Sequence, residues 1–338
     1  MAEKLGAQTI ALSRPPVFAG WGSTVGQKEG RGPLGRYFDH VDRDDRFGQS
    51  TWEQSEREMQ KQVLRLAELR AGPGTEAHFA GDLLNQCAAS SYAARERSLP
   101  FFGLYNACAT LGEGLILAAL ALESGALRQV SAAASSHFCT AERQYRMPLE
   151  YGGQRPPTAQ WTVTGAGAVV LAAQGHGPRI THLTPGRVVD LGVTDTCNMG
   201  AAMAPAACST IAAHLRDTGR SPDFYDLIVT GDLGLTGCGL LLELLGREGF
   251  PSLNNQADCG CLIFDRETQD VHCGGSGAGC CAAVLAGYFL PGLAAGRWKH
   301  ILFCPTGALH SPTTALQGES IPGICHALSL SAPDQEVK

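Results

Sequence analysis

The sequence carries little charge of either sign. Charged residues make up 17% of its 338 positions and the formal net charge is -6, with Lys and Arg scattered singly along the chain. A nucleic-acid-binding face requires basic residues gathered on one surface or along one helix. This absence excludes nucleic acid as an expected partner.

Long apolar runs suited to a membrane are also absent. The N-terminal stretch "MAEKLGAQTIALSRPP" mixes charges into a very short apolar run, and the apolar stretch 280–295 is interrupted by Pro291. A spanning helix needs about 20 apolar residues, and a signal peptide needs an uninterrupted apolar core. We therefore expect neither a signal peptide nor a transmembrane helix, so that any membrane role requires a partner protein.

The cysteines lack the spacing of a disulfide framework and of a zinc site. There are 13 of them, an odd number, in surroundings such as "GAGCCAAVLAG" and "ILFCPTGAL". Neither "CGC" at 259–261 nor the adjacent pair Cys280 and Cys281 supplies the paired C-x-x-C spacing of a zinc site. We expect reduced, mostly buried thiols and no metal site.

Apolar strand-like runs do occur, and they alternate with longer helical runs, which is typical of an α/β fold with a covered sheet. The two halves of the chain also repeat each other. The stretch "HFAGDLLNQ" at 78–86 recurs as "LIVTGDLGLTG" at 227–237, with a strand running into Gly-Asp-Leu both times. The sequence thus predicts a duplicated unit with halves 1–175 and 176–338.

A second pair of stretches extends this repeat. "ALESGALRQVSAAASSH" can be aligned with "GLAAGRWKHILFCPTGALHS", and in this register Cys108 lies opposite the Gly-rich stretch 273–279. We therefore expect two buried helices to begin at the same structural place. Only the first half contains the segment 137–160, which is rich in charged and aromatic residues. Insertions of this kind often carry function.

With this repeat in place, two features resemble the thiolase superfamily, which includes the ketoacyl-ACP condensing enzymes. Cys108 begins a buried helix, as the nucleophilic cysteine of that family does, and "TGAGAVVLAA" at 164–173 is similar to the strand that closes the family's first half. The resemblance implies a five-layered αβαβα fold and a homodimer paired along a sheet edge. It also implies that the helix start favours a thiolate at Cys108.

The residues that complete the chemistry of that family are missing from the matching positions. The family has a His after the strand that here reads "LIVTGDLG", and a His or Asn in the Gly-rich turn before the second helix. This sequence has Asp232 or its neighbours at the first place and "GGSGAG" at the second. Condensation needs such donors to stabilise an enolate oxyanion. The resemblance therefore implies an enzyme scaffold without catalysis.

Within the superfamily, motifs across residues 8–328 resemble the stage V sporulation protein AD family of endospore-forming bacteria. They include "GPLGRYFD", "ACATLGEG", "MGAAMAPAA", "GGSGAGCCA" and, most specific because condensing enzymes lack it, the segment 137–155. The resemblance implies binding of dipicolinic acid, alone or as its calcium chelate, for uptake into the developing endospore. It also implies integral membrane SpoVA proteins as partners and a peripheral location at the forespore or spore inner membrane. The only implied cofactor is Ca²⁺ carried in the chelate.

Dipicolinate is a small planar pyridine with two carboxylates, so its site needs cationic donors, N–H groups and a flat apolar wall. His310, near the point equivalent to His137 in the repeat, is a further candidate. The candidate ligand-binding residues are Asp82, Asn85, Cys108, His137, Arg143, Arg146, Asp232 and Ser276.

Each of these residues also has a structural interpretation. Cys108 could be one more buried thiol and His137 a satisfied core histidine. Arg143 and Arg146, three apart on a predicted helical turn, could pair with neighbouring glutamates and not with a ligand.

The two aspartates at the strand ends carry the wrong charge for an anionic ligand. Asp82 and Asp232 would repel dipicolinate unless they contact Ca²⁺ or cap a loop. Asn85 could offer its amide to the ligand or stabilise a turn, and the same choice holds for Ser276.

Two other functions stay open at this point. The chain could be an acyltransferase or a ketoacyl-synthase-like condensing enzyme in which Cys108 is the nucleophile and the insertion supplies the missing base. It could also be a purely structural scaffold. An acyl adduct on Cys108 would indicate the enzyme. Protection of Cys108 by the ligand without an adduct would indicate the binding protein, and a result with neither would indicate the scaffold.

Overall fold

Two halves of the chain follow the same order of strands and helices. The computed structural model describes residues 2–145, 155–250 and 253–333, and for 143–145 it describes the backbone alone. The first half ends with strand β9 and the second begins with strand β10, so the repeat changes over in the short connection between them.

The first half contains one long outer helix, α2, and one buried inner helix, α4. Its strands are β1 (Glu3–Leu5), β2 (Thr9–Ala11), β3 (Val17–Val25), β4 (His40–Val41), β5 (Ala77–Gly81), β6 (Phe101–Gly103), β7 (Gln129–Ser136), β8 (Trp161–Thr162) and β9 (Gly165–Ala172). Its helices are α1 (Gln27–Gly30), α2 (Trp52–Ala71), α3 (Ala88–Ala94), α4 (Thr110–Glu123) and α5 (Phe138–Tyr145).

The second half has the same plan. Its strands are β10 (Arg179–Thr184), β11 (Leu227–Thr230), β12 (Gln256–Asp258), β13 (Gly275–Ser276), β14 (His300–Cys304), β15 (Thr306–Ala308), β16 (Gly323–Cys325) and β17 (Ala327–Ser331). Its helices are α6 (Met199–Thr218), α7 (Gly234–Arg247), α8 (Cys259–Leu262), α9 (Ala278–Val284), α10 (Leu290–Ala294) and α11 (Pro312–Leu316).

The strand order confirms the duplication. The first half has the order β3-β9-β7-β5-β6 and the second β10-β17-β14-β11-β12. In both, the first two pairings are antiparallel and the last two are parallel. The two halves meet where β10 pairs with β3, through Arg179 and Val17, and with β2, through two further residue pairs.

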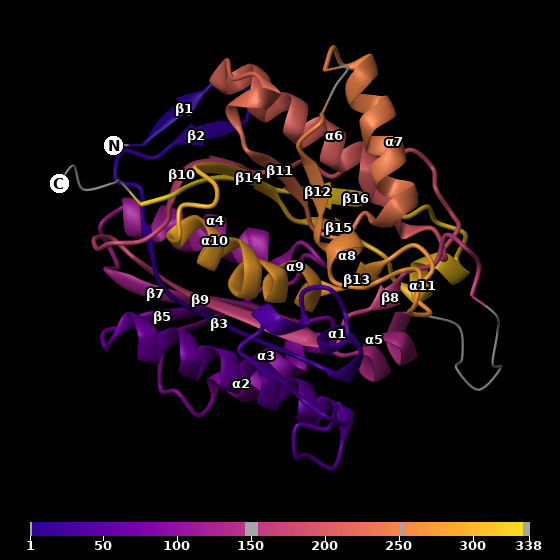
Figure 1. The fold of residues 1–338 in the computed structure, drawn as a ribbon, viewed down its shortest axis with the longest axis horizontal. Helices are drawn as coiled ribbons and strands as arrows, with labels where there is room; N and C mark the ends of the chain where they lie inside the picture. Colours follow the sequence, from indigo (N-terminus) through magenta and orange to yellow (C-terminus); the bar gives the residue numbers. More distant parts are fainter. Residues whose placement is uncertain (1, 146–154, 251–252, 334–338) are drawn as a thin grey trace.

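The elements stack in five layers (Figure 1). Helices α6 and α7 cover the sheet of the second half, α4, α9 and α10 lie between the two sheets, and α2 and α3 cover the sheet of the first half. This is the five-layered αβαβα arrangement that the resemblance implies, and it places the starts of α4 and α9 in the middle of the molecule.

The central helices are apolar on all sides because a sheet covers each side of their layer. All seven residues of α9 are buried, as are most residues of α4. The approach of α9 to the first sheet depends on glycine, since a Cβ at Gly279 would lie 2.1 Å from the carbonyl oxygen of Gly165. The two helix starts also touch, because the thiol of Cys281 in α9 donates to the carbonyl oxygen of Cys108 at 3.6 Å.

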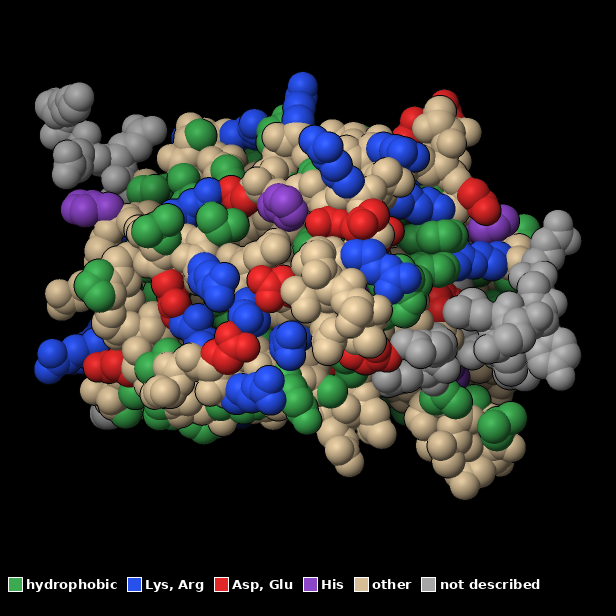
Figure 2. Space-filling view, turned by 90° about the horizontal axis from the view of Figure 1, so that it is seen from below, with side chains coloured by type: hydrophobic (Ala, Val, Ile, Leu, Met, Phe, Trp, Pro, Cys, Tyr) green, Lys and Arg blue, Asp and Glu red, His purple; other side chains and the backbone are tan. Residues whose placement is uncertain are grey.

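The outer helices are apolar on one face only. Helix α2 buries Met59, Val63, Leu64 and Ala67, and most of its charged side chains lie on the opposite face, whereas Glu56 is buried and accepts bonds from Ser135 and Thr140. On the face that includes α2, basic and acidic side chains are interspersed, as Figure 2 shows. Exposed pairs of this kind contribute little to stability.

The segment 137–160 lies within the first half, and the strand that follows it pairs with a strand of the second half. It begins as α5 directly after β7 and returns just before β8, which pairs in parallel with β13. Thr162 of β8 lies opposite Ser276 of β13 in this register. The returning end of the insertion is therefore attached to the turn that precedes α9.

Two further expectations concern membranes and thiols. Over residues 2–145, 155–250 and 253–333, the helices are too short or too polar to cross a membrane. The cysteines are free thiols and most of them are buried, as their spacing predicts.

Candidate functional site

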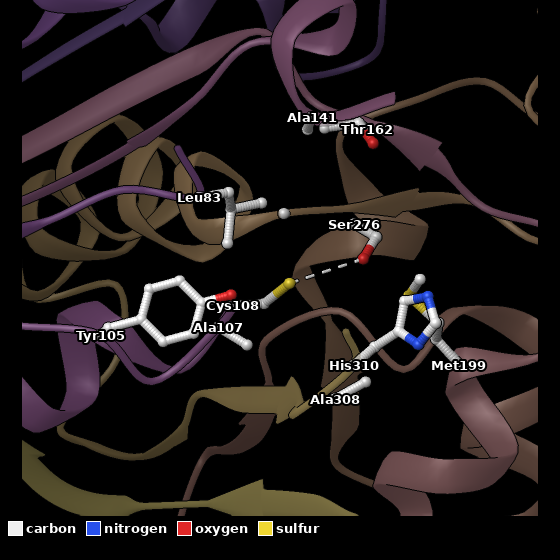
Figure 3. Close-up of a pocket in the computed structure, with 11 residues that line it drawn as sticks. Leu83, Tyr105, Ala107, Cys108, Ala141, Thr162, Met199, Ser276, Ala308 and His310 are labelled. Carbon is white, nitrogen blue, oxygen red and sulfur yellow. Dashed lines mark hydrogen bonds between the residues drawn. The ribbon is translucent and has the colours of Figure 1, made fainter. Parts of the chain in front are cut away.

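A cavity opens beside Cys108, where the two halves and the insertion meet (Figure 3). Tyr105 and Leu83 lie on one side of Cys108, and His310 and Met199 lie on the other. The cavity has a volume of about 40 Å³. It is lined by Leu83, Tyr105, Ala107, Cys108, Ala141, Thr162, Met199, Ser276, Gly277, Ala308 and His310.

Cys108 sits on a tight turn directly before α4. The preceding residue, Ala107, has a φ of 48°, in the left-handed region that non-glycine residues rarely occupy. The side-chain amide nitrogen of Asn106, Nδ2, lies 2.7 Å from Nε2 of His326, a residue of the second half. This contact holds the turn. Non-glycine residues in such conformations cluster at functional positions, where the surrounding structure maintains them.

A buried carboxylate lies behind the cavity wall. Oδ2 of Asp232 accepts hydrogen bonds from Ser276 Oγ at 2.7 Å and from Gly277 N at 3.0 Å. Its Oδ1 accepts a bond from Thr306 Oγ1 at 2.8 Å. Ser276 Oγ in turn lies 3.8 Å from Cys108 Sγ, so the hydroxyl connects the carboxylate to the thiol.

The environment keeps Cys108 as a neutral thiol. Burial raises its pKa well above the ordinary value, and the charge of Asp232 raises it further. A helix start favours an anion by only about 0.3–1 kcal/mol at most surface sites. The implied thiolate is therefore disfavoured, because burial and a nearby carboxylate outweigh the dipole of α4.

Asp232 itself titrates close to neutrality. Burial raises the pKa of its carboxyl to about 6, and hydrogen bonds from Cys108 and Ser276 limit the rise. The carboxyl is thus mostly ionised at pH 7, while the thiol beside it keeps its proton. Among the described residues, the cavity presents hydroxyl, thiol and imidazole groups to a ligand, and its thiol is protonated.

The structure brings together three of the eight proposed site residues and the further candidate His310. Cys108 and Ser276 line the cavity, Asp232 lies behind Ser276, and His310 forms part of the far wall. These positions agree with the juxtaposition of Cys108 and 273–279 that the repeat predicts.

Asp82 and Asn85 lie apart from this group. Oδ1 of Asp82 accepts a bond from Leu84 N at 2.8 Å, and Oδ2 accepts bonds from Ser90 N at 2.8 Å and Ser90 Oγ at 2.6 Å. The buried carboxylate therefore caps the turn before α3, while its neighbour Leu83 lines the cavity. Asn85 is exposed and is not a lining residue.

His137 is a core residue and is not part of the cavity lining. Its Nε2 lies 2.9 Å from the carbonyl oxygen of Asp45, and its Nδ1 accepts a bond from Cys139 N at 3.1 Å. Its ring packs on Trp52 at 5.1 Å between centroids. Burial lowers its pKa, so the ring is neutral and both of its nitrogens are engaged.

The two arginines proposed to meet the ligand carboxylates remain predictions. Arg143 belongs to α5, but its side chain is outside the described part of the structure, and Arg146 lies outside the described residues altogether.

Another arginine of the insertion, Arg155, is connected to the cavity. Its guanidinium carbon lies 4.1 Å from the ring centroid of Trp161, and Nη2 lies 3.6 Å from Oε1 of Glu142. The same Oε1 accepts a bond from Oγ1 of Thr162, a lining residue, at 3.1 Å. Arg155 was not among the predicted site residues, because its partners Glu142 and Trp161 lie on either side of it in the sequence and carry no motif.

Thr306 and Tyr105 were also missed, although the sequence contains signals for both. Thr306 follows β14 as Asp232 follows β11, and neighbouring parallel strands end at the same edge of a sheet. Tyr105 stands three residues before Cys108 and is 48% exposed, so it can offer an aromatic face at the cavity mouth.

Solved structures share this fold. A structure of OleA of Xanthomonas campestris matches with a TM-score of 0.60 at 16% identity, covering 95% of this chain and 99% of that one. The 3-oxoacyl-[acyl-carrier-protein] synthase III of Aquifex aeolicus VF5 matches with a TM-score of 0.57 at 12% identity, covering 94% and 99%. At these identities the likeness shows a thiolase-like fold and no more.

Sequence comparison is more specific. Stage V sporulation protein AD of Bacillus subtilis (strain 168) is 40% identical over 326 residues, which cover 96% of this chain and 96% of that protein. The family model of stage V sporulation protein AD matches residues 6–331. The chain has a thiolase-like fold, and it belongs to the stage V sporulation protein AD family, a family with a role in sporulation.

Proposed function

We propose that this protein binds dipicolinic acid, preferentially as its calcium chelate, in the cavity beside Cys108, and that it does so without catalysis. In this role it serves uptake into the developing endospore as part of the SpoVA complex. The observation that carries the proposal is the buried carboxylate of Asp232 behind Ser276 and Cys108. It disfavours a thiolate and an oxyanion in the cavity, and it favours a ligand that brings a cation.

The size of the cavity indicates how such a ligand enters. The cavity of about 40 Å³ is narrow, and Tyr105 is exposed at its edge. One carboxylate of the ligand would fit beside Ser276 and His310. The pyridine ring would then lie at the mouth against Tyr105, since a flat aromatic face is the surface that it stacks on.

Charge decides between the free ligand and the chelate. Free dipicolinate is a dianion at neutral pH, and burying it near the ionised Asp232 is unfavourable. The calcium chelate is neutral, and its metal prefers oxygen ligands such as carboxylates, hydroxyls and water. We therefore expect tighter binding of the chelate.

Calorimetry tests this function directly. The full-length protein is titrated with dipicolinate in the presence of excess Ca²⁺, with dipicolinate alone, and with Ca²⁺ alone. We expect saturable 1:1 binding of the chelate, weaker binding of the free ligand and no heat from Ca²⁺ alone. Absence of binding in both dipicolinate titrations would refute the proposal.

Replacing Cys108 by Ala tests how much its thiol contributes to ligand binding as part of the cavity wall. The thiol contributes only part of the lining, so Cys108→Ala should fold normally and weaken chelate binding by less than about tenfold, or 1.4 kcal/mol. Calorimetry measures the affinity, and circular dichroism checks the fold. An unchanged affinity would show that the thiol does not touch the ligand.

Acyl transfer through Cys108 is the second candidate, because the thiol occupies the nucleophile's place at the start of a buried helix. Incubation with acyl-CoA followed by intact-mass analysis distinguishes the two functions. A covalent acyl adduct that disappears in Cys108→Ala would support the enzyme. Protection of Cys108 from alkylation by the chelate, without an adduct, would support the binding protein.

We also propose that the protein is a homodimer joined along β6. This strand ends the sheet of the first half, and Phe102 on it is 49% exposed while its ring stacks on Phe79 at 4.6 Å. An apolar edge strand exposes unpaired backbone groups, and pairing across a two-fold axis covers them. Tyr105 follows this strand, so the partner subunit would lie next to the cavity mouth.

A charge at this edge should separate the subunits. Phe102→Glu is expected to shift the protein from dimer to monomer at micromolar concentration, as measured by sedimentation velocity. Leu242→Glu on α7, which is 40% exposed in the opposite outer layer, is the matched control and should remain dimeric. If the parent protein itself is monomeric, the dimer proposal is wrong.

We infer a peripheral location at the forespore or spore inner membrane, held by integral SpoVA proteins. Membership in the sporulation family supports this location. So does the lack of a helix able to span a membrane among the described residues.

A further inference from the structure

Two half-buried cysteines meet in the second half, outside the cavity lining. Cys238 belongs to α7 and Cys261 to α8. Their sulfur atoms and a carboxylate oxygen of Asp258 all lie within 4.8 Å of one another. Cys259, two residues before Cys261, is fully buried, so the two thiols of the pair differ from it in their access to solvent.

The carboxylate in this cluster is already saturated. Oδ1 of Asp258 accepts bonds from Thr230 Oγ1 at 2.7 Å and Leu233 N at 2.9 Å. Its Oδ2 accepts bonds from Gly234 N and Cys261 N, both at 3.1 Å. A carboxylate has about four acceptor positions. Asp258 therefore holds the starts of α7 and α8 and is not available as a metal ligand, which leaves the chemistry of two thiols.

The two thiols have different surroundings. A hydrogen bond with Cys238 is the largest cause that raises the pKa of Cys261, followed by burial. Nε2 of Gln256 also donates to Cys238 Sγ, at 3.3 Å. Because this N–H donor would stabilise a thiolate at Cys238, we assign the attacking role to Cys238.

We propose that Cys238 and Cys261 are a reactive dithiol that closes into a disulfide bond between α7 and α8 on exposure to a small-molecule disulfide. The Cys238 thiolate attacks one sulfur of the reagent, forms a mixed disulfide and releases one small thiolate. The Cys261 thiolate then attacks the Cys238 sulfur and releases the second. Two protein thiols are oxidised, one small disulfide is reduced to two thiols, and the protons of the protein thiols pass to the released thiolates.

A second pair in the same half serves as an internal control. The thiols of Cys304 and Cys325 also share a hydrogen bond. Both residues have 0% exposure, so a disulfide reagent cannot reach them in the folded protein. Contact without access should leave this pair reduced.

The test treats the folded, full-length protein with oxidised glutathione, removes the reagent, and then unfolds the protein in denaturant before the remaining thiols are alkylated and the protein is digested with trypsin. Trypsin gives a peptide 221–247 with Cys238 as its one cysteine, and a peptide 248–266 with Cys259 and Cys261. Cys304 and Cys325 fall together in 300–338. We expect 221–247 to be found linked to 248–266, while 300–338 stays fully alkylated.

Fragment spectra of the linked peptides assign the bond to Cys261 or Cys259. Cys261→Ser should abolish the link, and Cys259→Ala, the matched control, should retain it. The oxidised parent should also melt at a higher temperature than its reduced form, a shift that is lost in Cys238→Ser.

Two results would overturn the proposal. One is the absence of the link while exposed thiols elsewhere carry glutathione, which would show that the reagent was active. The other is a link that persists in Cys261→Ser.

Discussion

Asp232→Asn is expected to remove the preference for the calcium chelate. The neutral amide no longer attracts a cation through Ser276, so affinity for the chelate should fall by about tenfold to a hundredfold, the 1.5–3 kcal/mol typical of an interaction with a charged group. Free dipicolinate should bind more tightly, because the buried negative charge that opposes it is gone. Calorimetry with and without Ca²⁺ measures both affinities.

The same substitution should remove a pH dependence. The pKa of Asp232 is about 6, so its carboxyl is neutral below that pH and charged above it. Affinity of the parent for free dipicolinate should therefore fall as the pH rises through about 6, whereas the Asn variant should show a flat profile. A parent profile without this fall would mean that Asp232 does not face the bound ligand.

The Asn variant is suitable because it can keep the local hydrogen bonds. Its amide oxygen can accept from Gly277 N and Ser276 Oγ, and its amide nitrogen can face the hydroxyl of Thr306, which can also act as an acceptor. Asp226→Asn is the matched control, because Asp226 directly precedes β11 and Asp232 follows it. That exposed charge should leave the affinity and its pH profile unchanged.

Gly279→Ala is expected to destabilise the whole protein. The added Cβ would lie 2.1 Å from the carbonyl oxygen of Gly165 and 2.8 Å from Ser136 N, both of them backbone atoms of the first sheet. Relief requires α9 to move away from β7 and β9, and overpacking of a core commonly costs about 1–3 kcal/mol or more. We expect a free energy of unfolding lower by about 3 kcal/mol, measured by urea denaturation.

Gly246→Ala is the control with the opposite sign. Gly246 lies in α7, and a Cβ there would meet no atom within 4 Å. Alanine should stabilise this helix by about 0.5–1 kcal/mol. Equal effects of the two substitutions would mean that α9 is not packed against the sheet as tightly as the structure shows.

The repeat explains why the fold was predictable. A strand running into Gly-Asp-Leu occurs twice, and Asp82 and Asp232 do follow the equivalent strands β5 and β11. The same register placed Cys108 opposite Ser276, which lies 3.8 Å from it. The repeat predicts the contact between Cys108 and Ser276 because equivalent positions in the two halves meet at the starts of the central helices.

The different roles of the two aspartates could not be predicted in the same way. Asp82 takes its hydrogen bonds from Leu84 and Ser90, nearby in sequence, whereas the side chain of Asp232 takes two of its bonds from Ser276 and Thr306, 44 and 74 positions away. A local sequence pattern cannot distinguish an aspartate that caps a turn from one that belongs to a binding site when the hydrogen-bond partners are so distant in the sequence.

His137 illustrates the same limit. Its position at the end of β7 is where α/β folds build sites. Its ring is engaged by the carbonyl oxygen of Asp45, 92 positions earlier in the chain, and by Trp52. The sequence around His137 contains no sign of either contact.

The central layer of helices has a consequence for the repeat itself. Helices α4 and α9 come from different halves, yet they share one interior between the two sheets and touch at their first turns. A single half released from the other would leave its own all-apolar helix covered on one side only and exposed to water on the other. One copy of the repeat is therefore not a self-sufficient folding unit, and an ancestral single copy would have needed a second copy of itself as a permanent subunit.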